Sequence, residues 1–269
     1  MNEFTTRTIF GLLYAATIIA GIYFHPYGLL ALMVIIYFLG LTETKLLFKA
    51  EDEKTLYSSA AFLGVILLWA HMSFLQVFQD FLLPIVIFLI IVLLIHHLFL
   101  KDSESNLERL PKLIFATLYL FIPTALAISL AFLEGRFNPM YLLSIFFFLW
   151  ASDTCAYLTG IAIGKHKLIP RLSPKKSIEG LFGGIIGALI VAYILSIFLD
   201  NLTLVQWLIL GGITAIAGTI GDLFESSLKR AAGVKDSSNL IPGHGGILDR
   251  LDSFLISVPI VYFYLQFFT

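Results

Sequence analysis

The segment from Gly221 to Asp252 reads GDLFESSLKRAAGVKDSSNLIPGHGGILDRLD and lies between two long apolar runs. The first run opens near Leu204, and the second continues after Asp252 as SFLISVPIVYFYLQFF. A helix that spans a membrane needs about 20 mostly apolar residues, and both runs approach that length. Charges beside or inside such spans are energetically costly, so the acids and bases of this segment are candidates for a functional site.

The composition of the whole chain indicates an integral membrane protein. Its 269 residues are 59% hydrophobic and 13% charged, whereas soluble domains are about 45–50% apolar and about 25% charged. The mean hydropathy is +0.93. The net charge of −1 says little about partners, and no nucleic-acid partner is expected. The single cysteine, Cys155, excludes a disulfide within the chain.

The apolar runs predict an all-α, polytopic membrane protein with about nine spanning helices. They lie at 8–24, 28–48, 56–74, 79–100, 111–133, 140–163, 180–199, 204–226 and 247–268. With this number of spans, every Lys and Arg except Arg136 falls on one side of the membrane. Because basic loops stay in the cytoplasm, we expect a cytoplasmic N-terminus, a C-terminus outside, and insertion in the cell (inner) membrane.

The polar chemistry is concentrated in the second half of the chain. We interpret residues 1–135 as N-terminal spans that act as scaffold, lipid shelter or subunit contact, and residues 136–269 as the catalytic region. In the first half, Glu43, His96 and His97 lie near predicted cytoplasmic helix ends and read as polar residues at headgroup level. A lining for a lipid or ion path is the alternative for these three residues.

Two polar features precede the segment Gly221–Asp252 in the chain. Asp153 lies in the cytoplasmic half of the sixth predicted span, where it binds substrate, positions a metal, or joins a polar cluster between helices. The loop 164–180 contains SPKKS at 173–177, directly before the seventh span. This loop binds phosphate groups, or it reflects ordinary positive-inside bias and contact with anionic lipids. The candidate phosphate ligands are Ser173, Lys175 and Lys176.

The glycines of the seventh predicted span favour close helix packing. They recur at positions 180, 183, 184 and 187, so they share one face. Small residues at this spacing let two helix backbones approach each other. We therefore expect this face to pack against a neighbouring helix.

The acids around the eighth and ninth spans predict a metal site. Asp222, Glu225, Ser226 and Lys229 share one helical face, although Glu225 and Lys229 are also spaced for a helix-end salt bridge. Asp249 and Asp252 lie near the start of the ninth span. Magnesium in proteins usually takes one or two carboxylates together with phosphate oxygens and waters. Asp222 and Asp249 suit this role as bridging ligands.

Bases and glycines in the same segment suit a phosphorylated ligand. We expect Lys229, Arg230 and Lys235 to hold phosphates, because all three precede the Pro-Gly-His-Gly-Gly turn. The amides of Gly245 and Gly246 lie where a helix begins, and such positions attract anions. The P-loop pattern is missing from this segment, so a nucleotide site here would be of another kind.

At these residues the chain resembles the phosphatidate cytidylyltransferases, also called CDP-diacylglycerol synthases. The family signature is met from Ser226 to Asp252, including Lys229-Arg230, Lys235-Asp236 and the run from Ile241 onward. The upstream stretches SDTCAYLTG and SPKKSIEG also look like the family, although Ser177 stands where threonine is more usual. The motif-rich match covers about residues 150–252, and the first half resembles the family only as generic spans.

The resemblance implies that CTP and phosphatidate react to CDP-diacylglycerol and pyrophosphate, with the active site facing the cytoplasm. It also implies dependence on Mg²⁺ or a similar divalent cation, a second cation such as K⁺ in the acidic site, and a homodimer. On this view the catalytic residues are Asp222, Lys229, Arg230, Asp249 and Asp252. Substrate contacts are expected from Asp153, Ser173, Lys175, Lys176, Ser226, Lys235, His244, Gly245, Gly246 and Arg250.

Two other classes of protein remain open from the sequence. A CTP-dependent polyprenol or phytol kinase uses related chemistry but releases CDP instead of pyrophosphate. An ion-coupled transporter would use intramembrane acids as an ion path. Against a transporter, the predicted polar residues crowd one side of the membrane and leave no charged path to the other.

Overall fold

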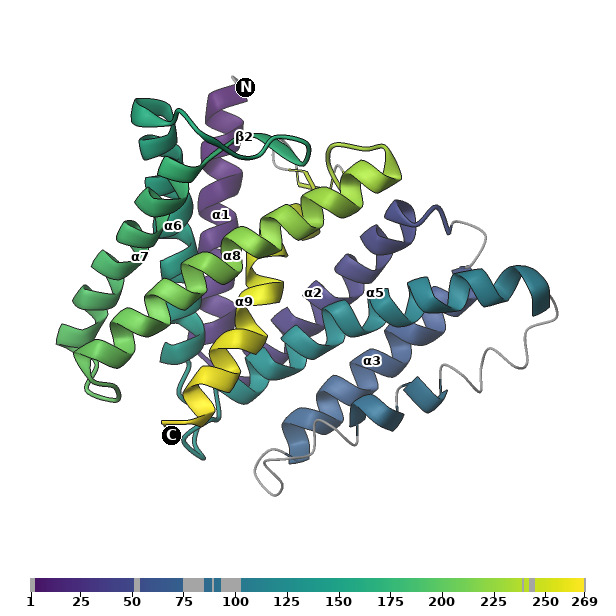
Figure 1. Cartoon of the computed structure of the whole chain (residues 1–269). Helices are drawn as coiled ribbons and strands as arrows, with labels where there is room; N and C mark the ends of the chain where they lie inside the picture. The colour runs from purple at the N-terminus through teal and green to yellow at the C-terminus, as the bar shows by residue number, and fades with distance from the viewer. Residues whose placement is uncertain are drawn as a thin grey trace. The chain divides into compact units, whose positions relative to one another are not determined.

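The computed structural model describes residues 3–50, 54–74, 85–88, 90–92, 103–238, 240–241 and 245–268. These residues are mostly helical, as the sequence predicted (Figure 1). The helices are α1 (Glu3–Tyr23), α2 (Pro26–Leu47), α3 (Lys54–Phe74), α5 (Ser103–Leu130), α6 (Met140–Ile163), α7 (Ile178–Phe198), α8 (Leu204–Ala232) and α9 (Leu248–Gln266). Two short strands, β1 (Lys167–Ile169) and β2 (Ser173–Ser177), form an antiparallel hairpin.

Within the part of the chain that the structure describes, five helices are long and apolar enough to cross a membrane, which is consistent with an all-α membrane protein. They are α2, the part of α5 from Leu110 to Leu130, α6, α7 and α8. The stretches Thr8–Tyr23 and Ala60–Ser73 are shorter apolar helices. Most of the predicted fourth span, with His96 and His97, lies outside the described residues. The total of nine spans and the orientation of the termini stay predictions.

The chain forms two compact units. The first unit comprises Met1–Asn138 and Asp236–Arg250, and the second comprises Pro139–Lys235 and Leu251–Thr269. The segment Asp236–Arg250 therefore groups with the N-terminal helices, although the sequence places it beside the acids of α8. Whether the halves 1–135 and 136–269 divide the work as scaffold and catalytic region stays a prediction.

In the first unit, α2 is the central helix, because α1, α3 and α5 all pack against it (Figure 1). Two glycines permit this close packing. A Cβ on Gly40 of α2 would collide with Leu120 of α5, and a Cβ on Gly64 of α3 would collide with the ring of Tyr37. The buried hydroxyl of Tyr37 donates a hydrogen bond to Ala60 O at 3.0 Å, which joins α2 to α3.

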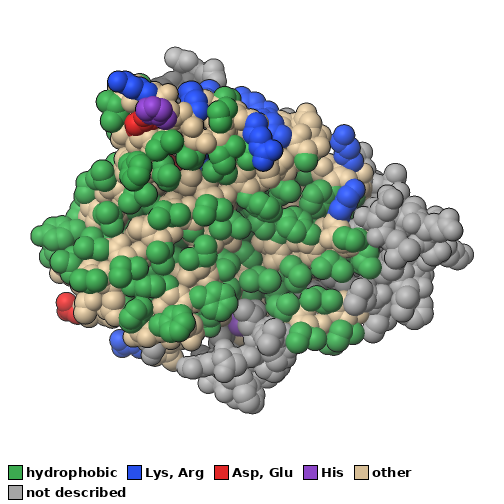
Figure 2. Space-filling model, viewed as in Figure 1, with side chains coloured by type: hydrophobic (Ala, Val, Ile, Leu, Met, Phe, Trp, Pro, Cys, Tyr) green, Lys and Arg blue, Asp and Glu red, His purple; other side chains and the backbone are tan. Residues whose placement is uncertain are grey.

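In the second unit, α7 packs closely along α6 and α8. The predicted packing role of the α7 glycines is confirmed, since Cβ atoms on Gly183, Gly184 and Gly187 would collide with side chains of α6. The opposite face of α7 exposes large apolar side chains, including Phe182, Ile186, Ile190 and Ile197. Figure 2 shows such hydrophobic side chains over a broad surface, with Lys and Arg gathered near the β1–β2 hairpin.

The hairpin is a local feature that the sequence interpretation treated as a loop. Ser177 ends β2 and caps α7, because its side chain accepts a hydrogen bond from Gly180 N at 3.1 Å. Glu179, in the first turn of α7, accepts hydrogen bonds from Lys165 N at 3.1 Å and His166 N at 3.2 Å. The hairpin is therefore tied at its base to the start of α7, and this tie determines where the lysines of β2 lie.

Candidate active site

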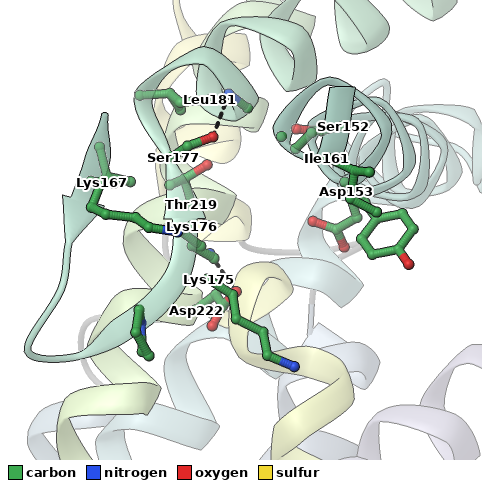
Figure 3. Close-up of a pocket in the computed structure, with 16 residues that line it drawn as sticks. Ser152, Asp153, Ile161, Lys167, Lys175, Lys176, Ser177, Leu181, Thr219 and Asp222 are labelled. Carbon is green, nitrogen blue, oxygen red and sulfur yellow. Dashed lines mark hydrogen bonds and ion pairs between the residues drawn. The ribbon is translucent and has the colours of Figure 1, made fainter. Parts of the chain in front are cut away.

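The second unit contains a pocket of about 550 Å³ (Figure 3). Its polar lining combines Asp153 of α6, Lys175 and Lys176 of β2, and Asp222 of α8. The other lining residues include Ala156, Tyr157, Gly160, Ile161, Leu168 and Leu181. Four residues singled out from the sequence thus line one cavity whose walls are otherwise largely apolar. Such a cavity can receive a molecule with a charged group and an apolar body.

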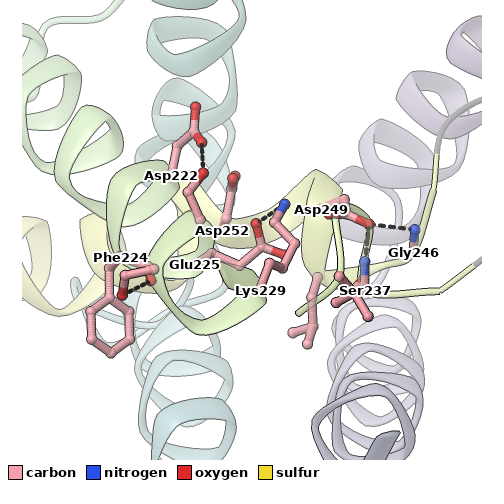
Figure 4. A network of polar contacts seen from close by, with 12 residues as sticks. Asp222, Phe224, Glu225, Lys229, Ser237, Gly246, Asp249 and Asp252 are labelled. Carbon is pink, nitrogen blue, oxygen red and sulfur yellow. Dashed lines mark hydrogen bonds and ion pairs between the residues drawn. The ribbon is translucent and has the colours of Figure 1, made fainter. Parts of the chain in front are cut away.

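The contact between Lys176 and Asp222 is the central polar interaction of this pocket. Lys176 Nζ forms an ion pair with Asp222 Oδ2, and Ser226 Oγ donates a hydrogen bond to Asp222 Oδ1 at 3.3 Å (Figures 3 and 4). The two charged side chains are 28% and 32% exposed, so both remain accessible to a ligand. An anionic ligand could take Lys176 from Asp222, and a cation could take Asp222 from Lys176.

Three further residues that were predicted to contact substrate differ in their exposure. Lys175 and Asp153 are exposed, whereas Ser173, at the start of β2, is half-buried and lies outside the pocket lining. Ser152, close to Asp153 in the sequence, also lines the pocket, as do Lys167 and Thr219, which the sequence interpretation did not single out. Lys167 pairs with Ser177 in the β1–β2 register. Lys167 reaches the pocket because β1 pairs with β2, so its position in the sequence alone does not indicate that it lines the pocket.

A group of acids extends from the pocket into the packing between α8 and α9. Asp252 is buried, and its Oδ1 accepts a hydrogen bond from Ser253 N at 2.6 Å. The charges of Asp222, Glu225 and Asp153 lie close enough to Asp252 to repel it. The helices lie so close together here that a Cβ on Gly221 would collide with the backbone of Asp252.

Lys229 is engaged with one of these acids. Its Nζ lies 2.5 Å from Glu225 Oε2, and its side chain is 11% exposed (Figure 4). The helix-end salt bridge that the sequence allows for Glu225 and Lys229 is therefore present. Contact between Lys229 and a phosphate would require this pair to open. By contrast, Arg230 and Lys235 are exposed, and Arg230 Nη1 donates to Val234 O at 3.0 Å.

In the first unit, Asp249 is held by the segment that precedes α9. Its Oδ2 accepts hydrogen bonds from Ser237 N at 2.9 Å, Ser237 Oγ at 2.9 Å and Gly246 N at 2.8 Å (Figure 4). Gly245 has a φ of +82°, a conformation that glycine adopts most readily. The amide of the next residue, Gly246, therefore donates to Asp249, whereas the sequence predicts that this amide contacts a phosphate. His244 lies outside the described residues.

Arg250 and Glu43 take part in contacts between residues 236–250 and the N-terminal helices. Arg250 is exposed, and its carbonyl oxygen accepts a hydrogen bond from Tyr14 of α1 at 3.2 Å. Glu43 is buried and bonded to Ser237 and Ser238, so its carboxylate is enclosed by protein groups, while its predicted depth at the headgroup level stays a prediction. Sequence reasoning missed these contacts because the partners lie almost 200 residues away.

The described residues contain no group of three or more His, Cys, Asp and Glu side chains arranged to hold a metal ion. Magnesium does not require such a group, because it commonly uses one or two carboxylates plus phosphate oxygens. The carboxylates of Asp222 and Asp252 supply donor atoms of the right type for such a cation. Asp222 and Asp249 belong to different units, so the metal they would share stays a prediction.

The sequence matches the model of the cytidylyltransferase family over residues 5–268. It is 32% identical over 248 residues to the phosphatidate cytidylyltransferase of Bacillus subtilis, covering 90% of this chain and 91% of that protein. It is also 49% identical over 122 residues to the protein of the same name from Staphylococcus saprophyticus, covering 45% of this chain and 47% of the relative. For the Haemophilus influenzae protein of that name, the identity is 45% over 159 residues, covering 56% of this chain and 55% of the relative. The chain thus spans about half the length of the last two relatives.

Proposed function

The chain belongs to the cytidylyltransferase family, and from this premise we propose that it transfers the cytidylyl group of CTP to phosphatidate. The products are CDP-diacylglycerol and pyrophosphate. The observation that carries this proposal is the Lys176–Asp222 ion pair in a largely apolar pocket. Phosphatidate has an anionic phosphate headgroup, which binds a cation, and acyl chains, which bind apolar surface. This pocket offers both kinds of contact.

The lysines of β2 receive the phosphate of phosphatidate. Lys175 and Lys176 line the pocket from the same strand, and Ser173 begins that strand. A phosphate that enters beside Lys176 competes with Asp222 for the ammonium group. Lysine serves as a point charge for phosphate, so the contact tolerates several headgroup orientations.

The reaction requires little covalent participation by the protein. A phosphatidate oxygen attacks the α-phosphorus of CTP, a new P–O bond forms, and the bond from that phosphorus to the β-phosphate oxygen breaks. The electron pair leaves with pyrophosphate. The attacking phosphate is already ionised near neutral pH, so no general base is needed. Positioning and charge neutralisation then supply most of the rate enhancement.

Charge on the triphosphate is offset by side chains of the segment between α8 and α9. Arg230 and Lys235 are exposed and contact it directly, whereas Lys229 first leaves Glu225. Arg250, Ser226 and the Gly245 and His244 region contribute to nucleotide binding. Asp153 and Asp252 complete the acidic side of the site.

We assign Mg²⁺, or a similar divalent cation, to Asp222 and Asp249, with a second cation such as K⁺ beside them. When bound, the divalent cation neutralises phosphate charge during the transfer. We further propose that the enzyme lies in the cell membrane as a homodimer, with its active site facing the cytoplasm. CTP is soluble and phosphatidate is a membrane lipid, so a site at that surface serves both substrates.

The deciding experiment measures nucleotide products from the purified full-length protein in detergent or vesicles. We expect pyrophosphate release from CTP that requires both phosphatidate and Mg²⁺. Release of CDP with a lipid alcohol would favour a kinase. Ion uptake by vesicles without CTP turnover would favour a transporter.

A further inference from the structure

Glu43 is a buried carboxylate near the C-terminal end of α2, in the part of the chain where we expected little chemistry. Its side chain belongs to a residue that is only 3% exposed. A buried carboxylate that lacks hydrogen-bond partners is strongly destabilising. Hydrogen-bond partners must therefore stabilise the carboxylate of Glu43 at this buried position.

Both oxygens of Glu43 accept hydrogen bonds from the segment that leads into α9. Oε2 accepts from Ser237 Oγ at 2.8 Å and from Leu248 N at 2.9 Å. Oε1 accepts from Ser238 Oγ at 2.7 Å and from Ile247 N at 2.8 Å. The two amides lie at the start of α9, where backbone N–H groups lack partners within the helix and a negative charge is stabilising.

Ser237 links Glu43 to Asp249. Its hydroxyl lies 2.8 Å from Glu43 Oε2 and 2.9 Å from Asp249 Oδ2, so one hydrogen is shared between two carboxylates. The space around this link is filled, since a Cβ on Gly246 would collide with both Ser237 Oγ and Glu43 Oε2. A change at Glu43 must therefore alter the hydrogen bonds that orient Asp249.

We propose that Glu43 is a positioning residue, which acts through Ser237 to set the orientation and charge of the Asp249 carboxylate. This inference rests on the proposed function, because it takes Asp249 to be a metal ligand. Partners that orient a ligating carboxylate commonly change metal affinity or activity by about 10–100-fold when they are replaced. Glu43 thus gives the N-terminal helices a direct part in cation binding.

The test is a Mg²⁺ titration of E43Q, S237A and the matched control T44V, followed both by pyrophosphate release and by the Mg²⁺-dependent rise in thermal stability of the substrate-free protein. Thr44 is the buried neighbour of Glu43, and its hydroxyl donates to Leu41 O at 2.9 Å within α2. We expect E43Q and S237A to raise the Mg²⁺ concentration for half-maximal activity by about 10-fold or more, on the scale of such partners. T44V should keep the wild-type midpoint. In the E43Q/S237A double variant the loss should be smaller than the product of the single losses, because both changes break one chain of contacts.

The outcomes separate this inference from the proposed function. Absence of phosphatidate-dependent pyrophosphate release by the wild type would overturn the proposed function and remove the premise for Glu43. If the wild type turns over and a folded E43Q keeps the wild-type Mg²⁺ midpoint, the function stands and the role of Glu43 is overturned. Folding is checked by size-exclusion chromatography and thermal unfolding. If E43Q fails to fold, the midpoint of S237A decides in the same way.

Discussion

Asp222 and Asp249 are the two acids predicted to bind the metal, but their surroundings in the structure are very different. Asp222 faces a pocket and is balanced by Lys176, a cation that another anion can take. Asp249 is held by neutral donors, namely the backbone and hydroxyl of Ser237 and the amide of Gly246. Asp222 can therefore exchange its partner for a ligand, whereas the Asp249 carboxylate is already oriented by neutral hydrogen-bond donors.

The largest effect is expected when either acid loses its charge. D222N and D249N should each lower turnover by about 10²–10³-fold, because the loss of one preorganised electrostatic contact in an enzyme site costs on that order. Asparagine keeps the shape and an acceptor oxygen, so both variants should fold. Pyrophosphate release at saturating substrate measures the effect, and unchanged elution from a sizing column verifies the fold. Near-normal turnover by either variant at physiological Mg²⁺ would remove that acid from the metal assignment.

An intermediate effect is expected at the exchangeable lysine. K176M should lower kcat/KM for phosphatidate by about 10–100-fold, mainly through KM, because the headgroup loses a cation while the apolar stem remains. K165M is the matched control, since Lys165 is exposed in the same connection but lies outside the pocket lining. Initial rates at varied phosphatidate distinguish the two. Equal, small effects in both variants would mean that Lys176 serves only to balance Asp222.

The smallest effect, and the sharpest comparison, comes from two glycines with positive φ. Gly245 and Gly233 have φ values of +82° and +78°, so alanine at either position costs about 1–2 kcal/mol of stability. Only at Gly245 would the added Cβ approach Asp249 Oδ2, at 2.6 Å. Gly233 has nothing within 4 Å.

We therefore expect G245A to lose at least as much thermal stability as G233A, and we expect a loss of activity, about 10-fold, only from G245A. Thermal unfolding and pyrophosphate release, measured on the same preparations, check both parts. Full activity of G245A would show that the surroundings of Asp249 are less rigid than its hydrogen bonds imply, and the contrast with Asp222 would disappear.

Local features of the fold were accessible from the sequence because they depend on near neighbours. The apolar runs predicted most helices, and the glycine spacing of α7 predicted its packing face. The β1–β2 hairpin was missed, since its strands are short and lie in a basic, proline-containing loop with no alternating pattern. The Glu225–Lys229 pair was visible in advance, because its partners lie one helical turn apart.

The amino-acid sequence by itself determined that this chain is helical, apolar enough for a membrane, and a carrier of the motif from Ser226 to Asp252. Only the tertiary structure decided that Lys176 pairs with Asp222, and that Glu43 binds the segment before α9. The physical reason is the sequence separation of the residues that decide each property. Helix formation and hydrophobicity are summed over adjacent residues, whereas the partner of a buried charge is chosen by packing between segments far apart in the chain.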